Sequence, residues 1–485
     1  MNESRNPDWQ TGPPEERDAR LASELQRSAA ELDPLVTLSQ SAQDEIVRFR
    51  ERYDSRPSDA PLPPVMLRQL RQGSRRYLEL QERLKGLAVQ YEPLADLHAR
   101  ELRHLRLDPA LWYAGVGLAT AAALTLYDNY LSLLLIMKDR RLRHLINDPD
   151  FGYGIGEDEL WKLVERMNSR SNRRRLRKLV GAWNDPPKDV SDETAGFLGP
   201  IRRTIESSVS YRYAEGEANE ESLPTRGRIR RMHAADRLER LADETIGTLS
   251  EVFGNGIGLI ETRKGKLWER QDVRQKVLDT LQPLDLLLEK TPFRLTDHFI
   301  PGHFGHVAIW MGTEGELDAL GVWNEPAMQA EPLCGCRQEV AHERSVLEAL
   351  RSGVELNTLR DFLNVDDLAV LRPKRLAPDQ VVPSLVRGFQ QVGKEYDFNF
   401  DVETTGTIVC SELPYHVYPG IDWRTESQLG RFTISPDDVA TQAIGQQAAF
   451  DLVLFYHDGE PVEADEALPL FTELVRKAHN RSWSS

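Results

Sequence analysis

The sequence predicts an α+β protein in which an all-α helical region precedes a C-terminal domain with a small antiparallel sheet. Leucines recur at helical spacing among charged residues through 19–106, which indicates packed amphipathic helices. Near Gly254 this pattern changes to short apolar runs bounded by glycine and proline, which are typical of strands. Helical patterns stand at the ends of these runs, so we expect helices at the ends of a small sheet.

The composition is that of a soluble globular protein. The 485 residues are enough for two or more domains with cores of their own. Hydrophobic residues make up 40% and charged residues 28% of the chain, which is ordinary for a folded protein. The net charge of −16 argues against a general nucleic-acid binder, so no nucleic-acid partner is expected. The 3 cysteines do not suggest a disulfide framework.

We divide the chain into a disordered tail over 1–18, a helical region over 19–253 and a C-terminal domain over 254–485. The tail is polar, contains prolines and has no periodicity. It also lacks the apolar stretch of a secretory signal, so we expect a cytoplasmic protein. Export by a route without such a signal, and association with a membrane, stay open.

Two leucine-rich segments open the helical region. Ala19–Tyr53 and Val65–Arg106 both show helical spacing, and the proline-rich stretch Asp54–Pro64 separates them. We interpret them as a helical bundle or a coiled-coil arm. Asp108 followed by Pro109 then predicts a helix start, because aspartate caps helices and proline suits the first helical position.

The most apolar segment of the chain follows. Ala110–Tyr127 is close to membrane-spanning length, and basic residues flank it. Asp128 and Asn129 interrupt the run before a second apolar piece, Tyr130–Met137. Small residues in the segment also allow close approach of neighbouring helices inside a soluble bundle. We favour a buried central helix, and membrane contact through 110–137 is the alternative.

The remaining elements follow from the same patterns. We expect a loop over Asp148–Gly156, a polar linker over 215–227 and three further helical segments: Asp158–Trp183, Asp192–Tyr213 and Arg228–Phe253. The C-terminal domain should open with a hairpin over 255–269 that turns at Lys264–Gly265. Its predicted strands are Leu284–Glu289, the run that begins at His306, Arg344–Leu350, Leu368–Arg372 and Phe450–Tyr456. Its predicted helices are Pro383–Gly393, a short helix opened by Cys410, and Ala464–Asn480.

Cys410 is the first candidate for chemistry. It follows an extended, aromatic-rich run and opens the short helix, where Ser411 and Glu412 suit a first turn and Pro414 is tolerated. A thiol at the positive end of a helix dipole favours the thiolate form. The alternative is that Cys410 is a small buried apolar residue.

Two further side chains complete a catalytic pattern. His306 begins a buried strand, and Glu348 stands in the middle of an apolar one, where an isolated charge is costly to bury without a partner. Cysteine, histidine and carboxylate on separate elements are the parts of a thiol nucleophile, its base and the group that orients the base. His303 competes with His306 as the base, because the sequence GHFGH places both near the strand start.

Several stretches carry a resemblance to a known family. They are LQPLDLLLEK (281–290), GHVAIWMG (305–312), VLEAL with a following GV (346–354), LAVLRP (368–373), and GKEYDFNFD with VCSEL (393–413). Together they resemble the permuted papain-like amidases of the YaeF/YiiX type, relatives of NlpC-type cell-wall peptidases and of lecithin:retinol acyltransferase. The resemblance covers roughly the last two-fifths of the chain. One departure is Leu284 before Asp285, where the family usually has glycine.

The resemblance implies the fold and the roles of the site residues. The order histidine, acid, cysteine is that of a circularly permuted papain-like domain. Cys410 would be the nucleophile, His306 its base and Glu348 the group that orients the base. Tyr396 would lie beside the cysteine and help to bind an oxyanion or the substrate. His306 is preferred to His303 because it directly precedes VAIW, as in the family motif.

No metal or cofactor is expected. The spacing of His298, His303 and His306 fits no standard ligand pattern, and no acid completes it. Cys334 and Cys336 form a C-x-C without a second ligand pair nearby, so we interpret them as structural or incidental.

The expected activity is that of a cysteine hydrolase. By resemblance, it would cleave an amide of the peptide or peptidoglycan type, or an ester, through a thioacyl intermediate. The substrate would be a peptide, a peptidoglycan fragment or a lipid. The alternatives are a lipid acyltransferase or acyl hydrolase at a membrane, suggested by residues 110–137, and a non-catalytic scaffold whose helical half binds a partner.

Overall fold

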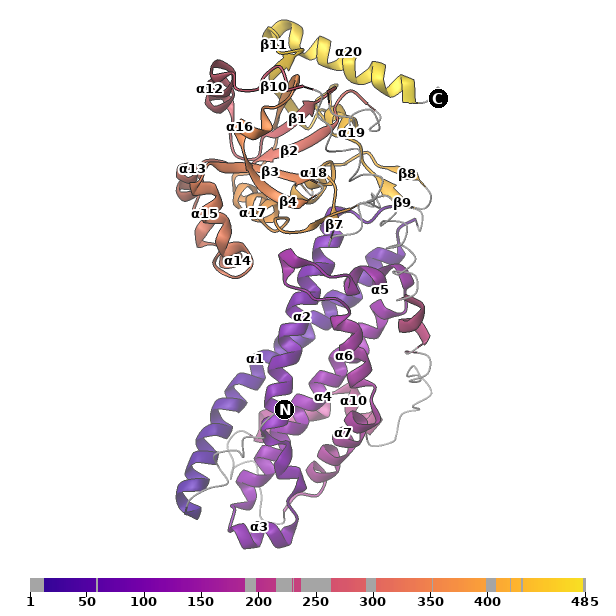
Figure 1. Cartoon of the computed structure of the whole chain (residues 1–485). Coiled ribbons are helices and arrows are strands. Elements are labelled where there is room, and N and C mark those ends of the chain that lie inside the picture. Colours follow the sequence, from indigo (N-terminus) through magenta and orange to yellow (C-terminus); the bar gives the residue numbers. More distant parts are fainter. Residues whose placement is uncertain are drawn as a thin grey trace. The chain divides into compact units, whose positions relative to one another are not determined.

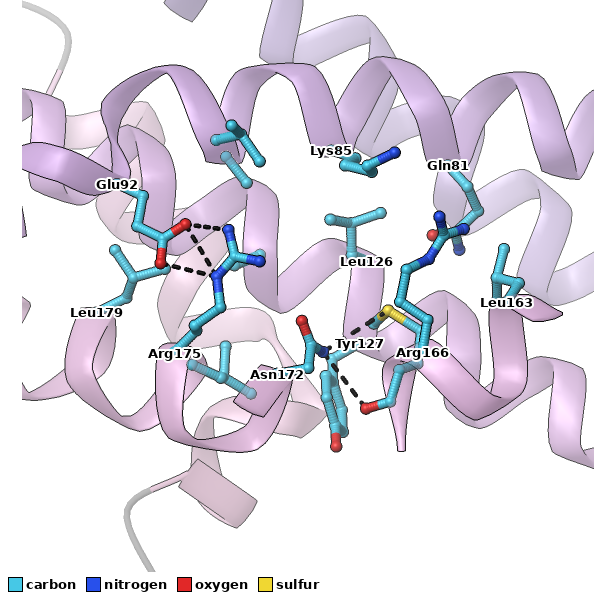
Figure 2. Close-up of a pocket in the computed structure, with 15 residues that line it drawn as sticks. Gln81, Lys85, Glu92, Leu126, Tyr127, Leu163, Arg166, Asn172, Arg175 and Leu179 are labelled. Carbon is cyan, nitrogen blue, oxygen red and sulfur yellow. Dashed lines mark hydrogen bonds and ion pairs between the residues drawn. The ribbon is translucent and has the colours of Figure 1, made fainter. Parts of the chain in front are cut away.

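The chain forms two compact units in the computed structural model (Figure 1). The structure describes residues 13–57, 60–187, 198–214, 229, 231–236, 263–293, 302–350, 352–397, 407–418, 420–428 and 431–482. A helical unit comprises 1–58, 72–147 and 158–236, and a C-terminal unit comprises 59–71, 148–157 and 237–485. The predicted α+β class is confirmed: helices precede a C-terminal domain that contains an antiparallel sheet.

The first unit is built from helices throughout its described residues. They are α1 (Pro14–Asp54), α2 (Pro64–Tyr91), η2 (Glu92–Asp96), α3 (Ala99–Leu105), α4 (Pro109–Met137), α5 (Arg140–Asn147), α6 (Glu159–Met167), α7 (Arg170–Trp183), α9 (Leu198–Ser207) and α10 (Val209–Ala214). The leucine spacing predicted the first two, and the proline-rich break between them is present. The predicted disordered tail is too long, because α1 begins at Pro14. Proline at the first helical position and acidic residues in the first turn favour this early start.

Helix α4 is the centre of the helical unit. It starts where the sequence predicts, and the Asp108 carboxylate accepts a hydrogen bond from the Ala110 N–H at 2.8 Å. Small residues let other helices approach it closely. A Cβ added at Gly117 would lie 2.6 Å from the Trp183 ring, and the Tyr113 ring stacks on Trp183 at 4.6 Å between centroids. Leucine in place of Gly117 would therefore not fit.

The polar interruption predicted in this segment does not break the helix, because its side chains have partners inside the bundle. The buried Asn129 amide donates to Ser39 at 3.1 Å and accepts from Gln43 at 2.9 Å. The Asp128 carboxylate accepts from the N–H and the hydroxyl of Ser210, at 2.8 and 2.6 Å. By length and composition α4 could cross a membrane, and 89% of its most apolar window is buried inside the structure.

The C-terminal unit contains one seven-stranded sheet in which every neighbouring pair is antiparallel. Its strand order is β11-β10-β5-β1-β2-β3-β4. The strands are β1 (Leu286–Lys290), β2 (His306–Trp310), β3 (Arg344–Leu350), β4 (Gly353–Thr358), β5 (Asp367–Pro373), β10 (Phe450–His457) and β11 (Glu460–Pro461). Five of these were predicted from their apolar runs. Two further pairs are β6 (Glu395–Tyr396) with β7 (Thr407–Ile408), and β8 (Glu426–Gln428) with β9 (Arg431–Thr433).

Helices surround this sheet in Figure 1. They are η3 (Phe151–Tyr153), α12 (Gln271–Thr280), α13 (Glu314–Leu320), η6 (Val322–Asn324), α14 (Pro326–Gln329), η7 (Leu333–Gly335), α15 (Cys336–Ala341), α16 (Leu359–Phe362), α17 (Pro378–Phe389), α18 (Glu412–Val417), α19 (Pro436–Thr441) and α20 (Ala464–Ser482). One apolar core joins α12 and α16 to alternate residues of the strands, among them Leu287, Trp310 and Val370. Because this core fixes the strand register, it also fixes where β2 and β3 place their polar residues.

Two expectations for this unit need correction. The described part of the predicted hairpin, 263–269, contains turns instead of strands. Its backbone bonds to a distant loop: the Gly265 N–H donates to the Asn364 side chain at 2.7 Å, and the Leu267 N–H to the Val365 carbonyl at 3.0 Å. Residues 255–262 lie outside the described part. Helix α17 starts at Pro378 and contains Pro383, which the prediction placed at its first residue.

The C-terminal unit takes in two short stretches that the sequence analysis placed in the helical region. Residues 148–157 pack closely on it: a Cβ at Gly152 would lie 1.8 Å from the Gln390 carbonyl oxygen. Residues 59–71 also contact it, and the Tyr415 hydroxyl donates to the Leu62 carbonyl at 2.7 Å. The predicted boundary at 253/254, the linker over 215–227 and most of the helix predicted over 228–253 lie outside the described residues.

Candidate active site

Cys410 lies between β7 and α18, directly before Ser411, which occupies the N-cap position of the helix. The thiol is buried, with 7% of the residue exposed. Burial alone would raise the pKa of Cys410, but the charge and hydrogen bond of His306 lower it below its ordinary value. The backbone N–H groups of Val307 and Ser411 also donate to the sulfur and lower this pKa further. The surroundings therefore favour the thiolate.

His306 is the first residue of β2 and contacts both other members of the predicted set. Its Nε2 lies 3.1 Å from Oε2 of Glu348, and its ring is hydrogen-bonded to Cys410. Burial lowers the pKa of His306, but the Cys410 thiolate, Glu348 and Glu289 raise it well above its ordinary value. Opposite shifts in the two pKa values describe a thiolate–imidazolium pair. The structure thus brings Cys410, His306 and Glu348 together.

Glu348 is held in place by two strands. It stands opposite Ala308 in the β2–β3 register. Ala308 is two residues after His306 on β2, so the two positions are on the same face of the sheet. One carboxylate oxygen faces His306, and the other accepts a hydrogen bond from Asn357 Nδ2 at 2.9 Å. Asn357 comes from β4. The sequence analysis did not single it out, because the strand had no strong apolar pattern.

Glu289 is a second residue that the sequence analysis missed. It stands directly opposite His306 in the β1–β2 register and is buried, with 3% of its surface exposed. Its negative charge contributes to the raised pKa of His306. The only signal in the sequence is an acid at the end of the apolar run LLLEK, and such an acid usually lies at the solvent edge of a strand.

Tyr396 reaches the same region through backbone pairing. It is half-buried and stands in parallel register with Ile408, two residues before Cys410. This places its backbone beside the strand that leads to the cysteine. Its role toward an oxyanion or a substrate stays a prediction.

His303, the competing base, points to different partners. Its Nε2 lies 2.9 Å from Oδ2 of Asp367, and the same oxygen lies 2.7 Å from Nδ1 of His457. The ligand atoms of these three side chains all lie within 4.8 Å of one another, which is a donor set that a divalent transition metal accepts. Of the other two histidines near His303 in sequence, His298 lies outside the described residues and His306 belongs to the cysteine site. Asp367 and His457 come from β5 and β10 and were not considered.

The backbone conformation at Leu284 explains why the family usually has glycine at this position. Its φ is +74°, in the left-handed region that favours glycine, and its side chain is fully buried. Asp285, the next residue, accepts from Arg372 Nε at 2.9 Å and Nη2 at 2.7 Å. Burial raises the pKa of Asp285, which Arg372 counteracts. The departure from the family pattern therefore lies at a strained turn away from the catalytic side chains.

The C-x-C pair is outside the site. Cys334 is exposed, and its thiol donates to Glu331 Oε1 at 3.0 Å, which raises the pKa of Cys334. Cys336 is buried, and burial raises the pKa of its thiol to about 12. All three cysteines are free.

The comparisons with known proteins agree with the geometry. Residues 280–463 match the family model described as permuted papain-like amidase enzyme, YaeF/YiiX, C92 family. The match contains His306, Glu348, Tyr396 and Cys410. Comparison with curated proteins and with solved structures gave no match. The C-terminal part of this chain, residues 280–463, thus belongs to the permuted papain-like amidases of the YaeF/YiiX type, a family of papain-like cysteine hydrolases.

Proposed function

We propose that the protein hydrolyses an amide bond, of the peptide or peptidoglycan type, or an ester, through a thioacyl intermediate on Cys410. The observation that carries the proposal is the position of His306, hydrogen-bonded to Cys410 on one side and 3.1 Å from Glu348 on the other. The lowered pKa of Cys410 and the raised pKa of His306 support a thiolate nucleophile in the resting protein.

The reaction follows from these two groups. The Cys410 thiolate attacks the carbonyl carbon and forms a tetrahedral oxyanion. The His306 imidazolium gives its proton to the leaving amine or alcohol as the bond to it breaks, which leaves a thioester on Cys410. Neutral His306 then takes a proton from water, and the resulting hydroxide attacks the thioester. Collapse releases the carboxylic acid and restores the thiolate–imidazolium pair.

The remaining groups orient the pair and bind charge. Because Nε2 of His306 faces Glu348, the ring presents Nδ1 to the sulfur, and the Glu348 carboxylate stabilises the cation. Asn357 fixes the other carboxylate oxygen. The oxyanion would be bound by backbone N–H groups at the start of α18 and by Tyr396.

The first test is the pH dependence of iodoacetamide alkylation, measured for each cysteine by peptide mass spectrometry. We expect Cys410 to react well below the ordinary thiol pKa of about 8.5. Cys334, which is exposed and has a raised pKa, should react only at higher pH, and Cys336 more slowly still. The substitution His306→Ala should remove the low-pH reactivity, whereas His303→Ala, the matched control, should leave it unchanged. Equal profiles for Cys410 and Cys334 would contradict the proposal.

The second test separates hydrolysis from transfer. Turnover of a chromogenic peptide amide should disappear in Cys410→Ala. Release of product in water alone supports the hydrolase, while release only with an added amine or alcohol acceptor would assign the site to acyl transfer. A reactive Cys410 with no turnover of any amide, ester or thioester would favour the scaffold.

A further inference from the structure

A small pocket in the C-terminal unit collects positive charge. It is lined by the beginning of α2, by the 148–157 stretch and by side chains on and after α17 and on α18, all of which belong to this unit. The lining residues are Pro64, Leu67, Arg68, Arg71, Tyr153, Arg387, Gln391, Lys394 and His416. About 20 Å³ of the pocket is open to the centre of a water-sized group. The pocket therefore has room for one small group.

The charges around the pocket are not balanced. The described lining residues include the cations Arg68, Arg71, Arg387 and Lys394 and no carboxylate. Beside the pocket, buried Asp150 lies 3.1 Å from the Lys394 ammonium and 3.6 Å from Arg71 Nε. One carboxylate thus faces two buried cations, although buried charges are normally paired.

Arg387 adds a further cation, which has no carboxylate partner among the described residues. Its guanidinium donates to two neutral oxygens, the Val417 carbonyl at 3.0 Å and the Ser384 hydroxyl at 2.5 Å. Burial and the charge of Arg68 lower the pKa of Arg387 to about 10. Burial, opposed by Asp150, also lowers the pKa of Lys394. A bound anion would relieve both effects.

Among the described residues, three buried polar atoms at the pocket have no hydrogen-bond partner. They are Nη2 of Arg71, Nε2 of His416 and Oε1 of Gln391. Arg71 is only 2% exposed, so its free N–H groups are cut off from bulk water. Burial and the nearby Lys394 and Arg71 lower the pKa of His416 to about 3, so its ring is neutral. A ligand that satisfies all three atoms needs acceptors for Arg71, a donor for Gln391, and a donor or an acceptor for His416 according to the tautomer of its ring.

We propose that this pocket binds one small oxyanion group, and that it prefers an oxyanion that carries an O–H, such as monohydrogen phosphate. The anionic oxygens accept from Arg71 and Arg68, and the O–H donates to Gln391 Oε1. Sulfate offers the same shape and charge without a donor and is the natural discriminator. The site is separate from the Cys410 chemistry and does not depend on it.

The test measures phosphate binding to the full-length protein by isothermal titration calorimetry, at constant ionic strength. We expect binding of inorganic phosphate, and weaker binding of sulfate. Glycerol phosphate is the third ligand tested. If it binds as tightly as phosphate, the natural ligand is the terminal phosphate group of a larger molecule. If it binds more weakly, the natural ligand is the free ion. Cys410→Ala should bind phosphate as the unaltered protein does.

Two variants make the proposal falsifiable. Arg68→Gln removes a half-buried cation and should weaken phosphate binding about tenfold, which is the size of one charged hydrogen bond. Arg360→Gln, on an exposed arginine of the same unit, is the matched control and should have no effect.

Gln391→Glu places a carboxylate of the same shape in the pocket. It should abolish phosphate binding without lowering the melting temperature, since the added charge faces an excess of cations. The proposal would be overturned if the unaltered protein bound no phosphate. It would also be overturned if Arg68→Gln and Gln391→Glu bound phosphate as tightly as the unaltered protein does.

Discussion

At the scale of single residues, the site depends on how one carboxylate divides its two oxygens. Glu348 directs Oε2 to His306 and Oε1 to Asn357, so its position is fixed from both sides. A carboxylate held in this way keeps the imidazole in one orientation and stabilises its positive charge. Glu289, across the other edge of β2, adds a second negative charge near the same ring.

The first prediction concerns the charge of Glu348. Glu348→Gln keeps the shape but removes the negative charge, so the pKa of His306 should fall and that of Cys410 should rise. Alkylation of Cys410 at pH 6 should then slow by at least about threefold, because less thiolate is present. The control is Glu339→Gln, which removes the charge of an exposed glutamate in α15 and should leave the alkylation profile unchanged. An unchanged alkylation profile in Glu348→Gln would show that the carboxylate does not act on the pair.

The second prediction concerns Asp367, whose pKa reflects opposing effects. Burial raises it, but hydrogen bonds from His303, the Asp458 N–H and His457 hold it below its ordinary value. A carboxyl group with a lowered pKa stabilises the fold above its unfolded pKa of about 3.9, and this contribution is lost as the pH falls through the folded pKa.

Asp367→Asn should therefore lower the free energy of unfolding by about 2 kcal/mol at pH 7, from weakened charged hydrogen bonds. The difference from the unaltered protein should shrink as the pH falls below about 4. Urea unfolding at both pH values measures it, with the exposed Asp451→Asn as control. A deficit that is the same at pH 7 and pH 3 would mean that the charge of Asp367 contributes nothing.

At the scale of elements, the structure shows which helices and strands are determined by the sequence of their own segment. Helices α1 and α4 and strands β2 and β3 follow from leucine spacing, from a cap and from apolar runs, and these signals lie within each segment. The segment 263–269 was mispredicted because its partners, Asn364 and Val365, are distant in sequence.

The site divides in the same way. His306, Glu348 and Cys410 were predicted because each stands out in its own stretch, and the family resemblance gave their order. Glu289 and Asn357 join the site only through strand register, which no single stretch encodes.

The third prediction tests the close approach of β4 to the backbone at the start of β6. Gly353 has a φ of +117°, and a Cβ there would lie 2.7 Å from the Lys394 carbonyl oxygen. Gly353→Ala should therefore destabilise the fold by about 1–3 kcal/mol, through backbone strain and the clash. Gly315→Ala is the control: it lies in α13 with open space around its Cβ position, so it should be neutral or slightly stabilising. Thermal unfolding of both variants gives the comparison, and equal melting temperatures would contradict the strain.

At the scale of the whole molecule, the chain passes between the two units more than once. Residues 59–71 and 148–157 belong to the C-terminal unit, although residues of the helical unit separate them from each other and from the rest. They supply Arg71 and Asp150 to the Lys394 cluster and the Leu62 carbonyl to Tyr415. The C-terminal unit is therefore larger than the matched family region.

The last prediction follows from this arrangement. A protein of residues 254–485 alone would leave Lys394 buried without Asp150, and removal of one partner of a buried ion pair costs about 3–5 kcal/mol. We expect it to melt at a lower temperature than the full chain, or to aggregate. Adding back peptides of residues 59–71 and 148–157 should raise its melting temperature, while scrambled peptides should not. A fragment as stable as the full chain would show that these stretches are dispensable.

The interleaved chain also orders events during synthesis on the ribosome. Residues 59–71 emerge early, while Lys394, Cys410 and the inner strand β10 emerge much later; at about 5–20 residues per second the delay is on the order of tens of seconds. Until then Arg71 and Asp150 stay in water, and one edge of β5 lacks its partner strand β10. A nascent chain that stops short of β10 would therefore carry the Cys410 thiol without its finished surroundings, so the candidate site is completed only after β10 has been synthesised.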